Sequence, residues 1–302
     1  MTKKEIDTLV PDIYEVLKGS VPSVDDSHPD EIIQYALNVA NAMRRSLTPR
    51  KKGRELGKYW ATDLGKPCDR SLWFDFNLPE GEEVEELEGH TRFKFMYGDT
   101  IEEKVLFLGK LTGHSIGREQ ERVELKLTNN GNDIIVSGRL DAVIDRTMVD
   151  VKSASPFAYN KYVKEGIHSG NDTFGYLWQL GYYFWFATPA AGNSSAAFLF
   201  IDKSMGHMAV KMVPRDQMPD DSAIERRAKT IDLTVREATP PVPPAKVAPV
   251  PDGKSGNMKL CTTCSYCKYK AQCYPTLRTF IYSTGPRFLT NVARTPNVPE
   301  AT

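Results

Sequence analysis

The stretch at residues 134–152 reads IIVSGRLDAVIDRTMVDVK, and it decides the fold class of this chain. Two apolar, β-branched runs flank a tight-turn signal at residues 145–147, so we expect two strands folded back on each other. Alternate side chains of a strand share a face, which places Asp150 and Lys152 side by side. Asp141 lies on the preceding strand, so the stretch predicts two carboxylates and one lysine close together.

Helical and strand-like patterns surround this pair of strands. Apolar residues at helical spacing predict helices at 3–18, 30–46, 91–112, 156–165, 174–187 and 217–236, with a short helix opening at Pro67. Alternating or continuous apolar runs predict strands at 118–127, 134–144, 148–152, 196–202 and 207–213. This order is typical of an α/β core in which a small mixed sheet is flanked by helices.

A proline-rich stretch divides the chain near its C-terminal end. Six prolines fall within residues 239–251, which favours an extended, semi-rigid spacer. We therefore expect an N-terminal helical region, a central core, a linker, a cysteine-bearing segment and a tail, at 1–90, 91–238, 239–256, 257–285 and 286–302.

The charges of the chain cancel, with 39 basic and 39 acidic residues, so net charge indicates no nucleic-acid partner. Basic residues gather at 44–58, where they would either neutralise phosphates or form a solvated loop. Six glutamates at 80–88 are typical of a surface loop. No apolar stretch is long enough to span a bilayer, and none follows the charged start. We therefore expect a soluble, intracellular protein with no membrane partner.

The acidic pair and the lysine suit one kind of chemistry. Two neighbouring carboxylates can share a hard divalent cation that keeps water ligands for a substrate. Such a cation polarises a phosphate oxygen and lowers the pKa of its bound water. Lys152 would orient or help deprotonate that water and offset charge that builds on phosphorus. An Asp-x-Lys motif is short, and alone it also fits a solvent-facing pair on an edge strand.

The five cysteines are split across the chain, with Cys68 far from Cys261, Cys264, Cys267 and Cys273. In an intracellular protein, cysteines at such spacings indicate metal binding or catalysis rather than disulfides. The four that lie at 261–273 could form one compact zinc site, with Cys68 a buried thiol beside it.

The series Gly138-x-x-Asp141, Asp150-x-Lys152 and Gln179-x-x-x-Tyr183 resembles the motif series of RecB-type nucleases in the PD-(D/E)XK superfamily. An upstream helix motif of that family, Gly-x-x-x-His/Glu, matches residues 98–102. The resemblance covers about residues 66–275. It implies a restriction-endonuclease-like core with N-terminal helices and a C-terminal iron–sulfur segment.

The same resemblance implies roles for individual residues. Ligands of Mg²⁺ or Mn²⁺ would be Glu102, Asp141, Asp150 and the backbone carbonyl of Val151. Lys152 would be the catalytic lysine, and Gln179 and Tyr183 would face the active site or the DNA strand; ordinary packing of an aromatic-rich helix is the other interpretation of Tyr183. Glutamate stands where the RecB form has histidine at position 102. Glu103 and Asp145 are competing carboxylates, although Glu103 points about 100° away around the helix and Asp145 suits a turn.

Cys68 with Cys264-x-x-Cys267-x5-Cys273 resembles the four-cysteine arrangement of AddB and of CRISPR-associated RecB-like exonucleases. In those relatives a [4Fe–4S] cluster pins the C-terminal segment against the N-terminal helices. The match implies such a cluster here, with Cys261 as an alternative ligand and Zn²⁺ as the alternative metal.

Together these resemblances imply a metal-dependent DNA exonuclease that acts on DNA ends or single strands, in DNA recombination or repair. A stand-alone chain of this kind would be cytoplasmic, in a prokaryote or a phage-infected host cell. A structure- or sequence-specific endonuclease is one alternative. A non-catalytic DNA-binding protein with a zinc site is another, and protein partners stay undefined.

Overall fold

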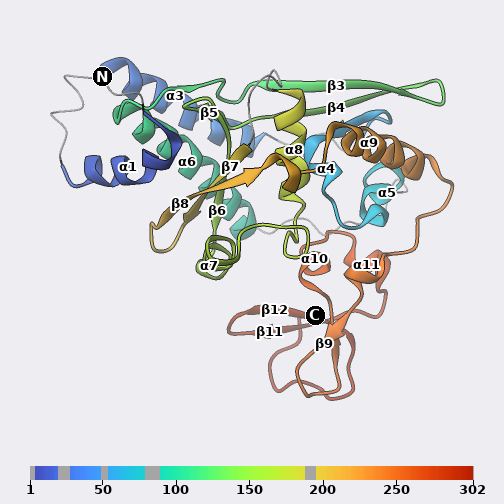
Figure 1. Ribbon diagram of the computed structural model, residues 1–302. Helices are drawn as coiled ribbons and strands as arrows, with labels where there is room; N and C mark the ends of the chain where they lie inside the picture. The colour runs from blue at the N-terminus through green and yellow to red at the C-terminus, as the bar shows by residue number, and fades with distance from the viewer. Residues whose placement is uncertain (1–3, 20–27, 49–53, 79–88, 188–194, 302) are drawn as a thin grey trace.

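The structure is a computed structural model that describes residues 4–19, 28–48, 54–78, 89–187 and 195–301 (Figure 1). The centre of the basic cluster and all six glutamates of the acidic run lie outside these ranges. Within them, no helix has the length and apolar character needed to cross a membrane.

The helices follow the periodicity of the sequence closely. They are η1 (Ile6–Thr8), α1 (Leu9–Leu17), α3 (Pro29–Leu47), α4 (Ala61–Leu64), α5 (Asp69–Asn77), α6 (Gly89–Leu111), α7 (Pro156–Glu165), α8 (Tyr176–Phe186), η2 (Arg215–Gln217), α9 (Asp221–Arg236), η3 (Ala245–Val247), α10 (Thr262–Ser265) and α11 (Lys270–Cys273). Side-chain caps fix two of the starts, because the Ser155 and Asp220 side chains accept from backbone N–H groups of α7 and α9. The six long helices predicted from the sequence are confirmed to within a few residues.

Strands form three sheets in the described residues. The strands are β1 (Lys58–Trp60), β2 (Ile116–Gly117), β3 (Arg122–Asn129), β4 (Asn132–Arg139), β5 (Ala142–Ile144), β6 (Thr147–Ala154), β7 (Ser195–Asp202), β8 (Met208–Pro214), β9 (Val250–Pro251), β10 (Met258–Lys259), β11 (Arg278–Tyr282) and β12 (Gly285–Asn291). The five-stranded sheet has the order β2-β5-β6-β7-β8, in which β6 and β7 are parallel and the other neighbours antiparallel. A three-stranded sheet has the order β1-β4-β3, and a four-stranded sheet has the order β11-β12-β10-β9.

The expected single strand at 134–144 is wrong, because the chain changes sheet at Leu140 and Asp141. Leu140 is fully buried, and the Asp141 carboxylate accepts a hydrogen bond from the backbone N–H of Val151. At this point the Asp141 side chain, rather than a backbone carbonyl, therefore accepts the hydrogen bond from the Val151 N–H. The expected strand at 118–127 starts later, because Arg118 and Gln120 have φ of 56° and 54°, a left-handed conformation that strands exclude.

The five-stranded sheet separates two apolar clusters. Val149 and Val151 of β6 pack in the cluster that includes Val105 and Leu106 of α6 and residues of α1. Met148 of β6 joins the other cluster, with residues of α7, α8 and α9. Alternation along β6 thus sends Asp150 and Lys152 away from the α6-side apolar cluster that holds Val149 and Val151.

The C-terminal part combines stretches that the sequence separates. β9 comes from the proline-rich stretch, β10 from the cysteine-bearing segment and β12 from the tail, and the three join one antiparallel sheet. Figure 1 shows this sheet beyond α10 and α11, at one end of the molecule. The proline-rich stretch is extended but anchored, because Arg70 Nη1 donates to the carbonyl of Pro241 and Val247 is buried. The expected divisions at 256 and 285 cut across this sheet.

The architecture is therefore a mixed α/β fold whose helices cover both faces of a mixed five-stranded sheet.

Candidate functional site

The predicted catalytic residues converge where α6, α8 and β6 meet the junction of β4 and β5. Glu102 comes from α6, Asp141 from the junction, Asp150 and Lys152 from β6, and Gln179 and Tyr183 from α8. The charges of Asp141 and Asp150 both raise the pKa of Glu102, and the charge of Asp150 raises that of Asp141. The structure thus brings together the residues that the motif series singled out.

Asp150 and Lys152 form a buried ion pair at the centre of this site. Asp150 Oδ2 lies 2.5 Å from Lys152 Nζ, and Asp150 is 2% exposed. Apart from this contact with Lys152, no donor in the described residues satisfies the oxygens of Asp150. Burial raises the pKa of Asp150 despite the nearby Lys152. Burial lowers the pKa of Lys152, but Asp150 and Asp141 raise it more, so the net pKa is raised and Lys152 is an ammonium ion.

Asp141 is held beside Asp150 by the backbone of β6. Its Oδ2 accepts a hydrogen bond of 2.7 Å from the N–H of Val151. Burial, and then the charge of Asp150, raise the pKa of Asp141 to about 7. Two carboxyl groups that disfavour each other's ionisation are therefore fixed side by side.

Glu102, on α6, is the third carboxyl group of the site. Gln120 Nε2 donates to Glu102 Oε1 at 2.6 Å. Burial raises the pKa of Glu102 to about 9, and the charges of Asp141 and Glu103 contribute. With this pKa the Glu102 carboxyl group is protonated at neutral pH, and it would lose the proton on binding a cation.

The two competing carboxylates, Glu103 and Asp145, interact with residues outside this site. Burial raises the pKa of Glu103, whose charge interacts with Asn38 and Arg45 of α3. Asp145 has φ of 47° in the turn between β5 and β6 and pairs with His114 Nδ1 at 2.5 Å. The choice of Glu102 and the assignment of Asp145 to a turn are both consistent with these positions.

Tyr183 links the helix α8 to the strand that carries Gly138. A Cβ atom at Gly138 would lie 2.5 Å from the Tyr183 hydroxyl oxygen, so only glycine leaves room for it. Gln179 hydrogen-bonds Tyr183, and burial raises the pKa of Tyr183 above its usual range. Tyr183 is 2% exposed, so it packs in the core while its hydroxyl group points at β4.

The donor set has the chemistry of a divalent-cation site. Three carboxyl groups lie within electrostatic range of Lys152, which is the one partner of the Asp150 oxygens among the described residues. Hard oxygen donors of this kind are those that Mg²⁺ and Mn²⁺ prefer. In the part of the chain that the structure describes, no group of three or more His, Cys, Asp or Glu side chains is arranged to hold a metal ion. The fit of a divalent cation therefore rests on the chemistry of the donor atoms. The backbone carbonyl of Val151, the remaining predicted ligand, lies next to Asp150 on β6.

Two residues that contact the site, Tyr176 and Gln120, were not predicted from the sequence. Tyr176 lies under Lys152, with Nζ 5.1 Å from the ring centre, and it precedes Gln179 by three positions on one face of α8. That spacing could have revealed Tyr176. Gln120 had no such signal, because it reaches Glu102 from an irregular segment between β2 and β3.

The five cysteines gather between α5 and the C-terminal segment. Burial raises the pKa of the Cys264 thiol, and the thiols of Cys261, Cys267 and Cys68 raise it further. Cys68 likewise raises the pKa values of Cys267 and Cys273, after burial. Cys68 therefore lies within electrostatic range of three thiols that are roughly 200 positions away in sequence, a long loop to close.

The surroundings of the thiols differ along the set. Cys267 and Cys273 pack against an apolar cluster of Trp73, Phe74 and Tyr269. The sulfur atoms of Cys261 and Cys264 both lie 3.5 Å from the carbonyl oxygen of Val247. Cys261 therefore lies beside Cys264, a position that both the iron–sulfur and the zinc interpretations allow.

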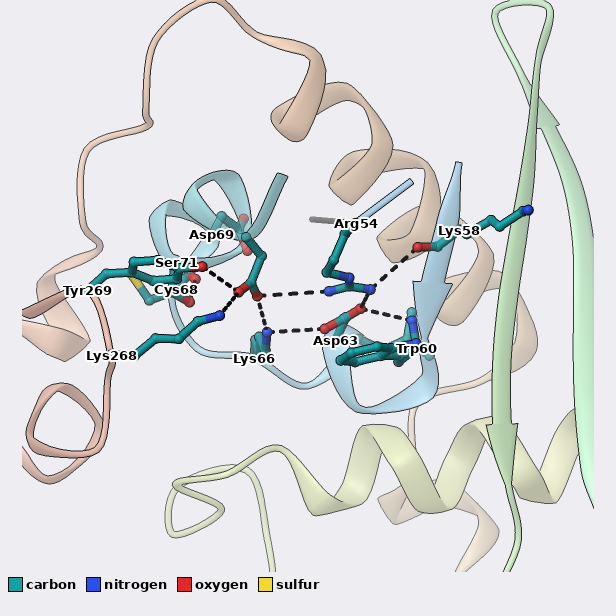
Figure 2. Close-up of polar contacts among 12 residues, drawn as sticks. Arg54, Lys58, Trp60, Asp63, Lys66, Cys68, Asp69, Ser71, Lys268 and Tyr269 are labelled. Carbon is teal, nitrogen blue, oxygen red and sulfur yellow. Dashed lines mark hydrogen bonds and ion pairs between the residues drawn. The ribbon is translucent and has the colours of Figure 1, made fainter. Parts of the chain in front are cut away.

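A network of charges holds the cysteine segment on α5 (Figure 2). Asp75 pairs with Lys66 at 2.7 Å and with Lys268 at 2.9 Å, and the Tyr269 hydroxyl donates to it at 2.7 Å. Burial raises the pKa of Asp75, but Lys66, Tyr269 and Lys268 outweigh it and lower the pKa overall. Lys66 also contacts Asp63, so the network continues toward β1.

Comparisons with known proteins add little to this geometry. No family model matches the chain, and no curated protein matches it. A solved structure described as "Crystal structure of SSO0001" is similar over 79% of this chain and 94% of that chain, with 16% sequence identity and a TM-score of 0.47.

Proposed function

We propose that this chain is a metal-dependent deoxyribonuclease with a PD-(D/E)XK core of the RecB type, acting as an exonuclease on DNA ends or single strands. The observation that carries the proposal is the convergence of Glu102, Asp141 and the buried Asp150 around the charged Lys152. Burying acids without equal positive charge costs folding free energy, which is typical of functional sites.

The residues have distinct roles in this proposal. Glu102, Asp141, Asp150 and the Val151 carbonyl would hold Mg²⁺ or Mn²⁺, which supplies Lewis-acid polarisation of a phosphate oxygen and acidifies a bound water. Among the described residues Lys152 is the cationic partner of Asp150, and a metal ion would occupy the lone pairs that this single contact leaves open. Lys152 offers a fixed positive charge to the phosphate as negative charge builds on it, since its raised pKa argues against a role as a base. Gln179 orients the hydroxyl group of Tyr183 toward β4.

An assay on end-labelled DNA tests the activity directly. Wild-type protein should degrade linear single- or double-stranded DNA with Mg²⁺ or Mn²⁺ and stop when the metal is chelated. Asp150→Asn and Lys152→Ala should each lose about 100-fold or more, because each removes a charge at the reacting centre. Asp133→Asn, at an exposed position of β4, is the matched control and should keep wild-type activity.

Substrate topology separates the alternatives. Cutting of closed circular DNA would favour an endonuclease over an exonuclease. DNA binding without metal-dependent cleavage by the wild-type chain would favour a non-catalytic DNA-binding protein and reject the nuclease proposal. Wild-type rates in Asp150→Asn would reject the assignment of the site.

For the cysteines we propose a structural [4Fe–4S] cluster held by Cys68, Cys264, Cys267 and Cys273. Support comes from the mutual electrostatic effects of these four thiols across a long stretch of sequence. Thiolates are the ligands that such clusters require. A zinc site made by Cys261 with the three later cysteines is the competing proposal.

A further inference from the structure

A pocket opens beside the acidic group, on the side of β4. It has a volume of about 260 Å³, and its walls include Trp60, Arg122, Gly138, Arg139 and Tyr183. Gly138 and Tyr183 also belong to the motif series of the candidate active site. Tyr183, which lines the pocket, also lies within electrostatic range of Asp150 and Asp141. The pocket therefore adjoins the carboxylates.

Two arginines from adjacent strands line this pocket side by side. Arg122 of β3 and Arg139 of β4 are direct partners in the antiparallel register. Like charges directly opposite each other in a sheet are destabilising. Glu124 compensates Arg122 through a contact of 2.8 Å to Nε, whereas Arg139 has no ion pair among the described residues. An anion between the two guanidinium groups would remove the repulsion.

Trp60 supplies an aromatic surface at the same pocket. Trp60 is 45% exposed and lies where β1 ends and α4 begins. The Arg54 guanidinium lies 4.1 Å from the centre of the Trp60 ring, and Asp63 fixes that guanidinium at 2.6 Å (Figure 2). A large, partly exposed aromatic ring is therefore held in place next to a cationic cleft. Such pairs of features bind nucleotides by stacking on the base and neutralising the phosphate.

We propose that this pocket binds one nucleotide of single-stranded DNA next to the bond that is cut. The base stacks on Trp60, and its phosphate lies between Arg122 and Arg139. Stacking on a side chain requires an unpaired base, so the pocket would take single-stranded rather than duplex DNA. The position relative to the cut bond rests on the proposed nuclease function, whereas the binding itself does not.

Fluorescence anisotropy with a labelled oligothymidylate in EDTA measures binding without cleavage. Trp60→Ala should weaken binding roughly 5- to 140-fold, the loss of one base–aromatic stack, while Trp60→Phe should retain most of it. Arg139→Gln should weaken binding and reduce the slope of log K against log salt by about 1. Arg226→Gln, on the exposed surface of α9, changes charge equally and should bind like wild type.

An abasic oligonucleotide separates the two contacts. Trp60→Ala should then bind like wild type, because there is no base to stack, whereas Arg139→Gln should still bind more weakly. Wild-type affinity for the oligothymidylate in both Trp60→Ala and Arg139→Gln would overturn the proposal. So would tighter binding of a blunt duplex than of the single strand by the wild-type protein.

The outcome is separable from that of the nuclease proposal. Binding that depends on Trp60 and Arg139 without any cleavage rejects the nuclease and supports the pocket. Cleavage with unchanged binding in both variants rejects the pocket and supports the nuclease. Circular-dichroism melting reports whether Trp60→Ala folds, and the exposed Arg139 provides the test if it does not.

Discussion

At the scale of single residues, the protonation of Asp141 and Glu102 is the most informative property of the site. Folding raises the pKa of Asp141 to about 7 and that of Glu102 to about 9, in both cases first through burial. The folded metal-free protein therefore keeps protons that the unfolded chain releases above about pH 4. The stabilisation from these protons is complete below about pH 4 and is lost as the pH rises through about 7 and then about 9.

We therefore expect the metal-free protein to be less stable at pH 8.5 than at pH 6. One unit of pKa shift corresponds to about 1.4 kcal/mol, so the free energy of unfolding should fall by roughly a few kcal/mol over this range. Urea unfolding in EDTA measures it. Asp141→Asn keeps an acceptor for the Val151 N–H but removes the titrating proton, so its pH dependence should be smaller.

Addition of Mn²⁺ should restore more stability at pH 8.5 than at pH 6, because the cation binds the ionised carboxylates. Identical pH dependence in wild type and Asp141→Asn would contradict this account of Asp141.

At the scale of elements, the contact of α5 with the cysteine segment depends on one buried carboxylate. Asp75 on α5 meets Lys66 from the preceding loop and both Lys268 and Tyr269 from the C-terminal segment. The Asp75 side chain is 8% exposed, so its charge is poorly solvated and is balanced by these partners. The network therefore aligns Cys68, which precedes α5, with Cys267, which precedes Lys268.

Asp75→Asn should destabilise the protein by about 3 kcal/mol, because it removes the buried charge that Lys66, Lys268 and Tyr269 share and leaves Lys66 with Asp63 alone. Thermal unfolding measures the loss, and limited proteolysis should show earlier cutting within 257–285. Asp216→Asn removes an exposed aspartate and should leave both readouts unchanged. Unaltered stability in Asp75→Asn would show that the apolar cluster around Trp73 suffices to hold the segment.

At the scale of the whole molecule, the cysteines decide how the two ends of the chain are joined. A cluster that uses Cys68 closes a loop of roughly 200 residues, which removes a large entropy from the unfolded chain. A zinc site within 261–273 would close only a short loop and leave Cys68 outside it. The two proposals therefore differ in which substitution loses the metal.

Protein purified without oxygen should be brown and contain iron, and Cys68→Ala should lose that iron and melt at a lower temperature. Cys261→Ala should keep both iron and stability. Elemental analysis and the visible sulfur-to-iron absorption measure the outcome. Stoichiometric zinc without iron, lost in Cys261→Ala and kept in Cys68→Ala, would replace the iron–sulfur proposal with the compact site.

Local patterns predicted the elements well where neighbouring residues decide them. The helices containing Glu102 and Gln179 and the turn at Asp145 follow from apolar spacing and turn chemistry, and the structure has them there. The break at Asp141 was not predictable, because it depends on a hydrogen bond from Val151, ten residues later.

The amino-acid sequence alone defines the kinds of residue available, namely three acids and a lysine at ordered spacings, five thiols in two groups, and helices with one apolar face. Those properties are local, because they depend on residue chemistry and on backbone periodicity. The packing of distant elements brings Cys68 to the later thiols and places a cationic pocket with Trp60 beside Gly138. These facts depend on how elements pack, and burial then shifts the pKa values that give the site its chemistry.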